Sequence, residues 1–246
     1  MKLSKLSSAL LAGGLLMTAV SAQAADEAAG SVTSSGSVAM TSNYQYRGIG
    51  QTSGTAAVQG ALTLSHESGL YASVWASSVG FAQGTEMDPS IGFAGKVGDV
   101  GYDVGILQYA YPGARNPNNF REIYGSVSAY GGKFGVAYSD DFFGETGKSI
   151  YTYLDYGTEV AAGFNVTAHV GYNILDDEYY GDITKTNPVT GAALLLDEDK
   201  YIDYKIGVNT AVTGITLEAA YVGTNLDDDK VADVGAKFVF TASKAF

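Results

Sequence analysis

The residues best placed to do chemistry in this sequence are charged side chains that alternate with apolar ones. In 201–212, Asp203 and Lys205 alternate with Ile202 and Tyr204, so the charges share one face of a strand. The same parity places a larger set on polar faces: Arg47, Glu67, Lys96, Asp103, Glu122, Asp155, Glu159, Asp203, Lys205, Glu218, Asp233 and Lys237. Charges of this kind need water or a partner. We therefore expect them to line a watery interior in which acids outnumber bases.

Two interpretations of this interior are open. An open lumen with excess carboxylates predicts a cation-favouring channel. The alternative is a lattice of ion pairs that fills the interior, with Lys205 and Lys237 bridging neighbouring carboxylates. For Arg47 the partner is also open: a lipid phosphate near the outer rim, or a lumen pair with Glu67 or Asp233.

Catalytic residues are the second class of candidates, and the only histidines are His66 and His169. Ser65, His66 and Glu67 are consecutive, but neighbouring strand residues point to opposite faces, so they cannot form a triad without a bulge. His169 falls on the polar face, where it suits a structural hydrogen bond as well as a general base. The chain has no cysteine, which excludes thiol chemistry and disulfides. We expect no enzyme and no cofactor.

Acidic clusters mark three segments between the expected strands. They are Asp140 and Asp141 with Glu145, the acids within 176–199, and the run 227–229. Hard divalent cations favour oxygen-rich clusters, but no run has the spacing of a calcium loop. Solvated charge on outer loops is the preferred interpretation, and no metal site is predicted.

The elements that must position these residues are strands with period-two alternation. We expect twelve: 35–46, 56–66, 69–81, 88–97, 100–111, 119–130, 133–141, 149–161, 164–175, 201–212, 214–224 and 232–246. Their connections alternate between tight glycine-containing turns and longer loops, as in an up-and-down barrel with both termini at the short-turn end. Parity is ambiguous in 100–111 and 119–130, which leaves a ten-stranded barrel as the alternative.

The last segment, 232–246, indicates that the sheet faces lipid. Val234, Ala236, Phe238, Phe240 and Phe246 share one face, and the chain stops on the last of these. Lipid offers backbone groups no hydrogen-bond partners, so only a closed sheet spans a membrane with strands. We expect the three Phe residues to form the signal read by the barrel assembly machinery, and this strand to pair with the first.

Residues 1–24 have the features of a secretory signal peptide. Lys2 and Lys5 precede the apolar run 9–20, and small residues at Ala22 and Ala24 form a cleavage site. After removal at about Ala24, we expect a loose segment at 25–34, a transmembrane β-barrel at 35–246, and a long extracellular loop at 176–200. No later run is long enough for a spanning helix.

The composition suits a barrel. There are 32 Gly, 18 Tyr, 10 Phe and only 4 Pro, with 16% charged residues. Two of the 14 basic residues lie in the signal peptide, so 12 face 26 acids, a formal charge of −14 that argues against nucleic-acid binding. Aromatic residues gather near the expected outer strand ends and are interpreted as an interfacial girdle: Tyr44, Tyr46, Tyr109, Tyr111, Phe142, Phe143, Tyr151, Tyr153, Tyr172, Tyr179, Tyr180 and Tyr221.

The sequence also resembles a known family. The segment TSNYQYRGIGQT at 41–52, followed by SHESGLY at 65–71, VWAS at 74–77, GYDVG at 101–105 and HVGY at 169–172, is similar to the proteobacterial porins of the TorF family. The resemblance spans essentially all of the chain after the signal peptide. It implies an outer-membrane β-barrel with a channel role.

Together these observations predict an outer-membrane porin for passive diffusion of small polar solutes or ions. The expected partners are outer-membrane lipid, lipopolysaccharide and the assembly machinery; the oligomeric state stays open. A plugged structural or ligand-binding barrel is the alternative.

Overall fold

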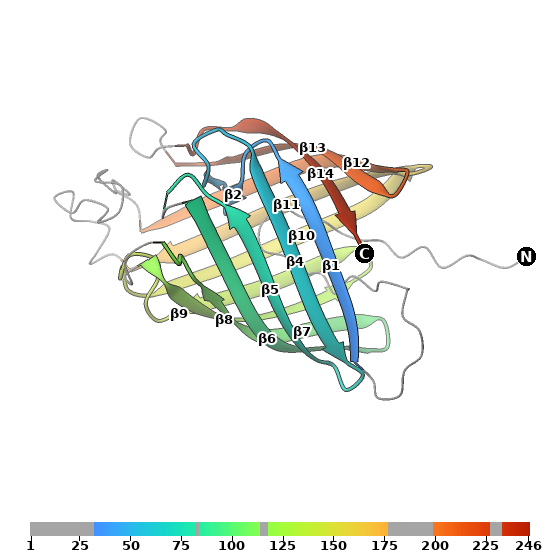
Figure 1. Cartoon of the computed structure of the whole chain (residues 1–246), viewed down its shortest axis with the longest axis horizontal. Coiled ribbons are helices and arrows are strands. Elements are labelled where there is room, and N and C mark those ends of the chain that lie inside the picture. The colour runs from blue at the N-terminus through green and yellow to red at the C-terminus, as the bar shows by residue number, and fades with distance from the viewer. Residues whose placement is uncertain (1–31, 82–83, 114–117, 177–198, 227–232) are drawn as a thin grey trace, which may run out of the picture.

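A closed antiparallel barrel forms the body of the molecule (Figure 1). The computed structural model describes residues 32–81, 84–113, 118–176, 199–226 and 233–246. Its wall consists of β1 (Val32–Thr41), β4 (Ala57–His66), β5 (Leu70–Ser78), β6 (Thr85–Val97), β7 (Val100–Tyr109), β8 (Phe120–Ala129), β9 (Gly132–Ser139), β10 (Ser149–Ala161), β11 (Phe164–Leu175), β12 (Lys200–Val212), β13 (Ile215–Thr224) and β14 (Lys237–Ala245). Each strand pairs with its neighbours along the chain, and β1 also pairs with β14. The predicted twelve-stranded barrel is therefore confirmed, and the ten-stranded alternative is wrong.

The outer face of the wall is apolar, as the alternation predicted. In β14, Phe238 and Phe240 are 68% and 59% exposed, whereas Val239 and Ser243 between and beyond them are buried. The same pattern exposes large apolar side chains around the barrel, among them Val38, Met40, Val58, Leu62, Ile91, Val104, Ile123, Leu154, Val170 and Ile206. In the described residues no helix has the length and apolar character needed to cross a membrane.

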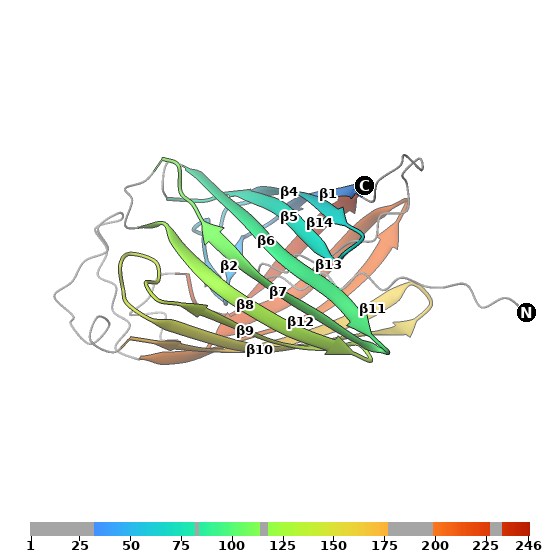
Figure 2. The same ribbon diagram turned by 90° about the horizontal axis from the view of Figure 1, so that it is seen from below.

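Tight turns connect neighbouring strands at one end of the barrel, and the C-terminus of the chain lies at this same end (Figure 2). Tyr130 and Gly131 both have positive φ, 51° and 82°, and so do Thr213 and Gly214, 51° and 79°. Two consecutive positive φ values give the hairpin turn whose twist matches that of the flanking strands.

Tyrosines on the inner wall lie across glycines of the neighbouring strand. Tyr71 covers Gly92, Tyr124 covers Gly105 and Tyr153 covers Gly135, so closely that a Cβ at any of these glycines would collide with the ring or hydroxyl. A ring laid over a glycine stabilises that weak point of a strand. It also leaves more of the lumen free than a ring projecting inward would.

The seam between β1 and β14 depends on the last residue. Ser37 to Thr41 pair with Ala245 to Thr241, and Gly36 and Phe246 then exchange two backbone hydrogen bonds of 2.9 and 3.0 Å. The Phe246 ring lies over Gly36, 2.8 Å from where a Cβ would be. The predicted pairing of the final strand with the first is confirmed.

Several strand boundaries differ from those expected. β1 already begins at Val32, inside the segment 25–34 that was expected to be loose, and β5 ends at Ser78 and not at residue 81. β1 ends at Thr41 and not at residue 46, because residues 43–52 turn into the barrel. β6 starts earlier than expected, at Thr85, and β14 starts later, at Lys237. Val234, expected on the lipid face, is fully buried in the connection before β14. The predicted signal peptide, nearly all of the long loop 176–200 and the acidic run 227–229 lie outside the described residues.

Candidate functional site

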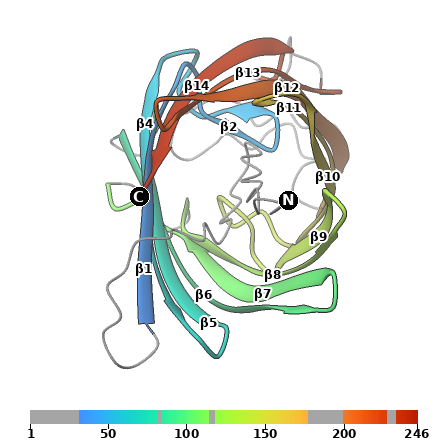
Figure 3. The same cartoon turned by 90° about the vertical axis from the view of Figure 1, so that its right-hand side faces the viewer.

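The first long connection folds into the lumen. Its short strands β2 (Gln45–Tyr46) and β3 (Ile49–Gly50) form a hairpin that Figure 3 shows inside the ring of the wall. Arg47 and Gly48 form its tip with positive φ of 47° and 77°. A backbone hydrogen bond of 2.9 Å from Gly50 to Asp233 ties the hairpin to the segment before β14. The segment is therefore held inside the barrel and does not extend from its rim.

Arg47, at the tip of the hairpin, contacts the opposite side of the barrel wall. Its guanidinium donates to Glu122 on β8 at 2.6 Å and to Asn173 on β11 at 3.4 Å, and lies 4.0 Å from the centre of the Tyr151 ring on β10. In the order of the barrel these strands are across from β1 and β4, which flank the hairpin. Arg47 therefore spans the lumen.

The ion pair of Arg47 is buried and charged. The two side chains are 5% and 3% exposed. Burial by itself lowers the pKa of Arg47, but Glu122 together with the surrounding tyrosines outweighs it, and the pKa lies well above its usual value. The expected partners, a lipid phosphate, Glu67 or Asp233, were wrong, because nothing in the sequence indicates that residues 43–52 turn inward.

Aromatic side chains pack around the hairpin at the long-loop end. Tyr109, Tyr111, Phe120, Phe142 and Tyr201 form a buried cluster with Leu107 and Leu175, and Tyr46, Ile49, Phe81, Phe143 and Leu226 pack against it. Tyr109 and Phe120 stack with ring centres 4.1 Å apart. Much of the predicted girdle is thus interior packing. Of that set, Tyr172 and Tyr221 are exposed on the outer face, and Tyr179 and Tyr180 lie outside the described residues.

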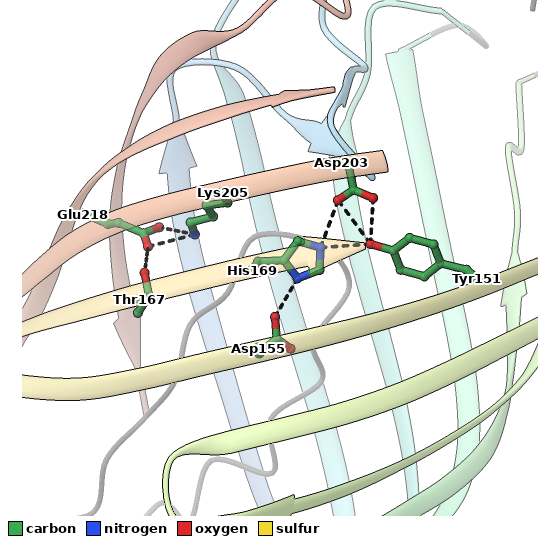
Figure 4. Close-up of polar contacts among 7 residues, drawn as sticks. All are labelled: Tyr151, Asp155, Thr167, His169, Asp203, Lys205 and Glu218. Atoms are coloured by element: carbon green, nitrogen blue, oxygen red, sulfur yellow. Dashed lines mark hydrogen bonds and ion pairs between the residues drawn. The ribbon is translucent and has the colours of Figure 1, made fainter. Parts of the chain in front are cut away.

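A hydrogen-bonded cluster of ionisable groups lies on three adjacent strands of the inner wall (Figure 4). The two ring nitrogens of His169 contact Asp155 at 2.6 Å and Asp203 at 2.9 Å. The Tyr151 hydroxyl donates to Asp203 at 3.0 Å and lies 2.9 Å from His169 Nε2. His169 thus lies between two carboxylates, and Tyr151 links this cluster to Arg47.

A second ion pair lies beside this cluster in Figure 4. Lys205 Nζ is 2.8 Å from Glu218 Oε1, and the Thr167 hydroxyl donates to the same oxygen at 3.5 Å. Lys205 therefore pairs with a neighbouring carboxylate, as the ion-pair lattice predicts.

The remaining candidate charges fall into two groups. Asp103 faces the interior and accepts a hydrogen bond from Tyr71 at 2.8 Å, while Lys96 and Glu159 occupy inward positions near the short turns and are exposed. Glu159 accepts from the Gly163 backbone at 2.9 Å. Lys96 and Glu159 thus lie at the mouth of the lumen.

Two of the predicted charges are in connections between strands and not on the strands of the wall. Glu67 is exposed in the turn between β4 and β5. Asp233 lies in the connection before β14, where it pairs with Lys237 and accepts from Asn43 at 3.4 Å. Glu67 therefore does not face the lumen, because the strand ends at His66 before the parity can be extended.

Three inward charges were missed. Lys133 lies over the Tyr153 ring at 5.7 Å, and Glu86 and Asp88 are buried on β6. Asp88 lies an even number of residues from Lys96, and Lys133 is next to the outward-facing Phe134. The alternation in the sequence therefore already indicated that Asp88 and Lys133 point inward. Glu86 was assigned to a loop because β6 begins earlier than predicted.

The consecutive residues Ser65, His66 and Glu67 do not form a triad. Ser65 and His66 fall on opposite faces of β4, and His66 Nδ1 contacts the Ser68 hydroxyl at 2.8 Å. Within the described ranges no three His, Asp or Glu side chains are grouped as a metal site.

A family model described as "Bacterial protein of unknown function (Gcw_chp)" matches residues 25–246. No curated protein matches the sequence.

Solved structures show similarity in fold. The KdgM porin is 8% identical, with a TM-score of 0.52, over 87% of this chain and 99% of that one, and the same values hold for the KdgM porin in complex with disordered oligogalacturonate. The COG4313 outer-membrane channel from Pseudomonas putida F1 is 12% identical, with a TM-score of 0.49, over 90% and 97%.

Proposed function

The chain belongs to the Gcw_chp family of bacterial proteins, and we propose that it is an outer-membrane channel for small polar solutes or ions. The observation that carries this proposal is the contrast between the two faces of the wall. Large apolar side chains cover the outside, while Asp103, Lys133, Asp155, Asp203 and Lys205 face inward. A closed sheet with an apolar exterior suits lipid, and charges inside it need water or partners.

The lumen is proposed to favour cations. Its acids are Glu86, Asp88, Asp103, Glu122, Asp155, Glu159, Asp203 and Glu218, and its bases are Arg47, Lys96, Lys133, Lys205 and Lys237. Arg47, Lys205 and Lys237 are paired with Glu122, Glu218 and Asp233. The remaining excess of carboxylates raises the local concentration of cations.

The ligand found in the KdgM porin complex is not carried over to this chain. That porin has been captured with oligogalacturonate, which is itself a chain of carboxylates. An acid-rich wall repels such a ligand, so small cations and small neutral solutes suit this lumen better.

The same proposal includes export and assembly. Residues 1–24 direct the chain across the inner membrane, and the assembly machinery recognises the strand that ends at Phe246. Lipid and lipopolysaccharide then surround the apolar wall. N-terminal sequencing of outer-membrane protein should begin at Ala25, and unboiled protein should migrate differently from boiled protein.

Conductance in a planar bilayer is the decisive measurement. Folded protein should give small single-channel steps and a reversal potential toward the cation value in a salt gradient. Selectivity should weaken at high salt, because the Debye length falls from about 10 Å at 0.1 M to about 3 Å at 1 M.

Charge removal inside and outside the lumen separates wall effects from surface effects. The double variant Asp103→Asn with Asp155→Asn should move the selectivity toward neutral. The matched control Asp140→Asn with Asp141→Asn removes the same charge from an exposed loop and should leave it unchanged. Anion selectivity of the unmodified protein would contradict the acidic-lumen proposal.

One observation favours a second function, that of a plugged structural barrel. The hairpin and the aromatic cluster occupy the long-loop end of the interior. A plugged barrel predicts no conductance from verified, folded protein, and none after the hairpin 45–50 is replaced by a short glycine-serine link. Conductance that appears only in this variant indicates a channel closed by its first loop.

A further inference from the structure

Two carboxylates with no countercharge lie on the inner wall close to the first loop. Glu86 and Asp88 are two positions apart on β6, so both side chains point into the barrel. They are 1% and 0% exposed. Their carboxyl groups lie close enough to influence each other. The two side chains therefore form a compact, buried pair of acids.

Most of its oxygens are unsatisfied. Tyr44 donates its hydroxyl to Glu86 Oε1 at 3.2 Å. Glu86 Oε2 and both oxygens of Asp88 have no hydrogen-bond partner among the residues the structure describes. No lysine or arginine in that part of the chain forms an ion pair with either carboxylate, and the nearby Arg47 pairs with Glu122.

A third polar group points to the same region. Asn118, just before β8, is 0% exposed, and neither atom of its amide has a partner among the described residues. The register pairs Met87 with Ala110 and Tyr109 with Phe120. Asn118, two residues before Phe120, therefore lies at the same end of the wall as Glu86. Asn118 has the same parity as Phe120, whose ring packs in the interior. Burial alternates over 118–120, so the Asn118 amide faces inward at the end of the barrel that contains Glu86.

Two ionised carboxylates are not stable in such a place without compensation. Burying an unpaired charge costs several kcal/mol or shifts its protonation. Either a shared proton or a bound cation resolves the conflict. A shared proton satisfies the two acids alone, whereas a cation also takes up the free amide oxygen and the tyrosine hydroxyl.

We propose that Glu86 and Asp88 bind a hard divalent cation of the Ca²⁺ class, with the Asn118 amide oxygen and the Tyr44 hydroxyl as neutral ligands. Carboxylate, amide and hydroxyl oxygens are the ligands such ions prefer, and a double positive charge neutralises the pair. Because Tyr44 leads into the hairpin, the ion fastens the first loop to β6, in addition to its attachment through Arg47.

The fluorescence of Trp75 can report whether a metal ion is bound at this site. Trp75 is the only tryptophan, its Cα pairs with that of Asp88, and its ring centre lies 5.3 Å from that of Tyr44. Terbium ions occupy Ca²⁺ sites and emit when a nearby indole is excited. Metal-free protein refolded into detergent should show indole-sensitised Tb³⁺ emission, which added Ca²⁺ should displace.

Variants locate the site. Asp88→Asn keeps a hydrogen-bonding partner for Glu86 and removes one charged ligand, so it should fold and bind Tb³⁺ at least about tenfold more weakly. Glu86→Gln should do the same. The matched control Asp140→Asn with Asp141→Asn removes two acids from an exposed loop and should leave the sensitised emission unchanged.

The outcomes are distinct and do not depend on conductance. Emission from the unmodified protein that is lost in Asp88→Asn, with folding verified by heat-modifiable migration, supports the site. No sensitised emission from folded, unmodified protein, or equal emission from Asp88→Asn, overturns it. If Asp88→Asn does not fold, Glu86→Gln and the effect of Ca²⁺ on the unfolding midpoint of the unmodified protein decide: an unchanged midpoint indicates a shared proton and overturns the proposal.

Discussion

The contact most open to a quantitative test is the one between Arg47 and the far wall. Replacing Arg47 with Ala removes a guanidinium that binds Glu122 at 2.6 Å and lies on the Tyr151 ring at 4.0 Å. Glu122 is then left buried, with the Tyr109 hydroxyl at 3.0 Å as a remaining donor. Breaking a buried ion pair by removing one partner costs about 3–5 kcal/mol. Because one donor stays in place, we expect the lower end of that range.

The double variant Arg47→Met with Glu122→Gln isolates the pair from the packing. It leaves no buried charge unpaired, so it should be more stable than Arg47→Ala by about 2 kcal/mol. Urea unfolding of detergent-refolded protein, followed by Trp75 fluorescence, measures both values. Arg121→Ala is the matched control, because Arg121 is next to Glu122 on β8 but exposed on the outer face, and it should change stability little.

Conductance gives an independent readout of the same contact. Releasing the hairpin tip from β8, β10 and β11 should let the first loop move, and single-channel steps of Arg47→Ala should be larger or more variable than those of the unmodified protein. If Arg47→Ala is as stable as Arg121→Ala and conducts identically, the guanidinium does not hold the loop, and the reasoning from this ion pair fails.

Three further predictions follow from the described contacts. Deleting Phe246 should sharply lower the outer-membrane level, and Gly36→Val should do so partially, because a Cβ there meets the Phe246 ring at 2.8 Å; normal levels in both would contradict the role of the seam. Lys205→Ala should destabilise the barrel by about 3 kcal/mol by leaving Glu218 without its 2.8 Å partner, and adding Glu218→Gln should restore much of the loss in urea unfolding. His169→Ala should lower the unfolding midpoint more than His169→Gln, because the amide retains hydrogen bonds to two buried carboxylates; equal midpoints would refute this.

What the sequence determined by itself was the wall. Alternation in segments such as 164–175 and 201–212 reports directly which face meets lipid, because a strand side chain has only two directions available. Glycine-containing turns and the terminal Phe246 then fixed the order of the strands and the end at which the barrel closes. The boundaries of β10 and β11 match those expected.

The alternation does not predict which inward side chains contact each other. Alternation places Glu122, Asp155 and Asp203 inside but does not say which side chain faces which, since that depends on the register and on the curvature of the closed sheet. His169 between two carboxylates is an example: its neighbours come from β10 and β12.

Only the tertiary structure decided the content of the lumen. Tyr44, Tyr46 and Arg47 continue the pattern of β1, so the sequence extends that strand to residue 46, whereas the chain leaves the sheet after Thr41 and fills the interior. A tyrosine at a strand end has the same local signature in a lipid-facing girdle as in a packed interior. The two differ only in what surrounds the ring, and in this barrel the surroundings are supplied by segments distant along the chain: Phe120, Phe142 and Tyr201 for the aromatic cluster, and Glu122 for Arg47.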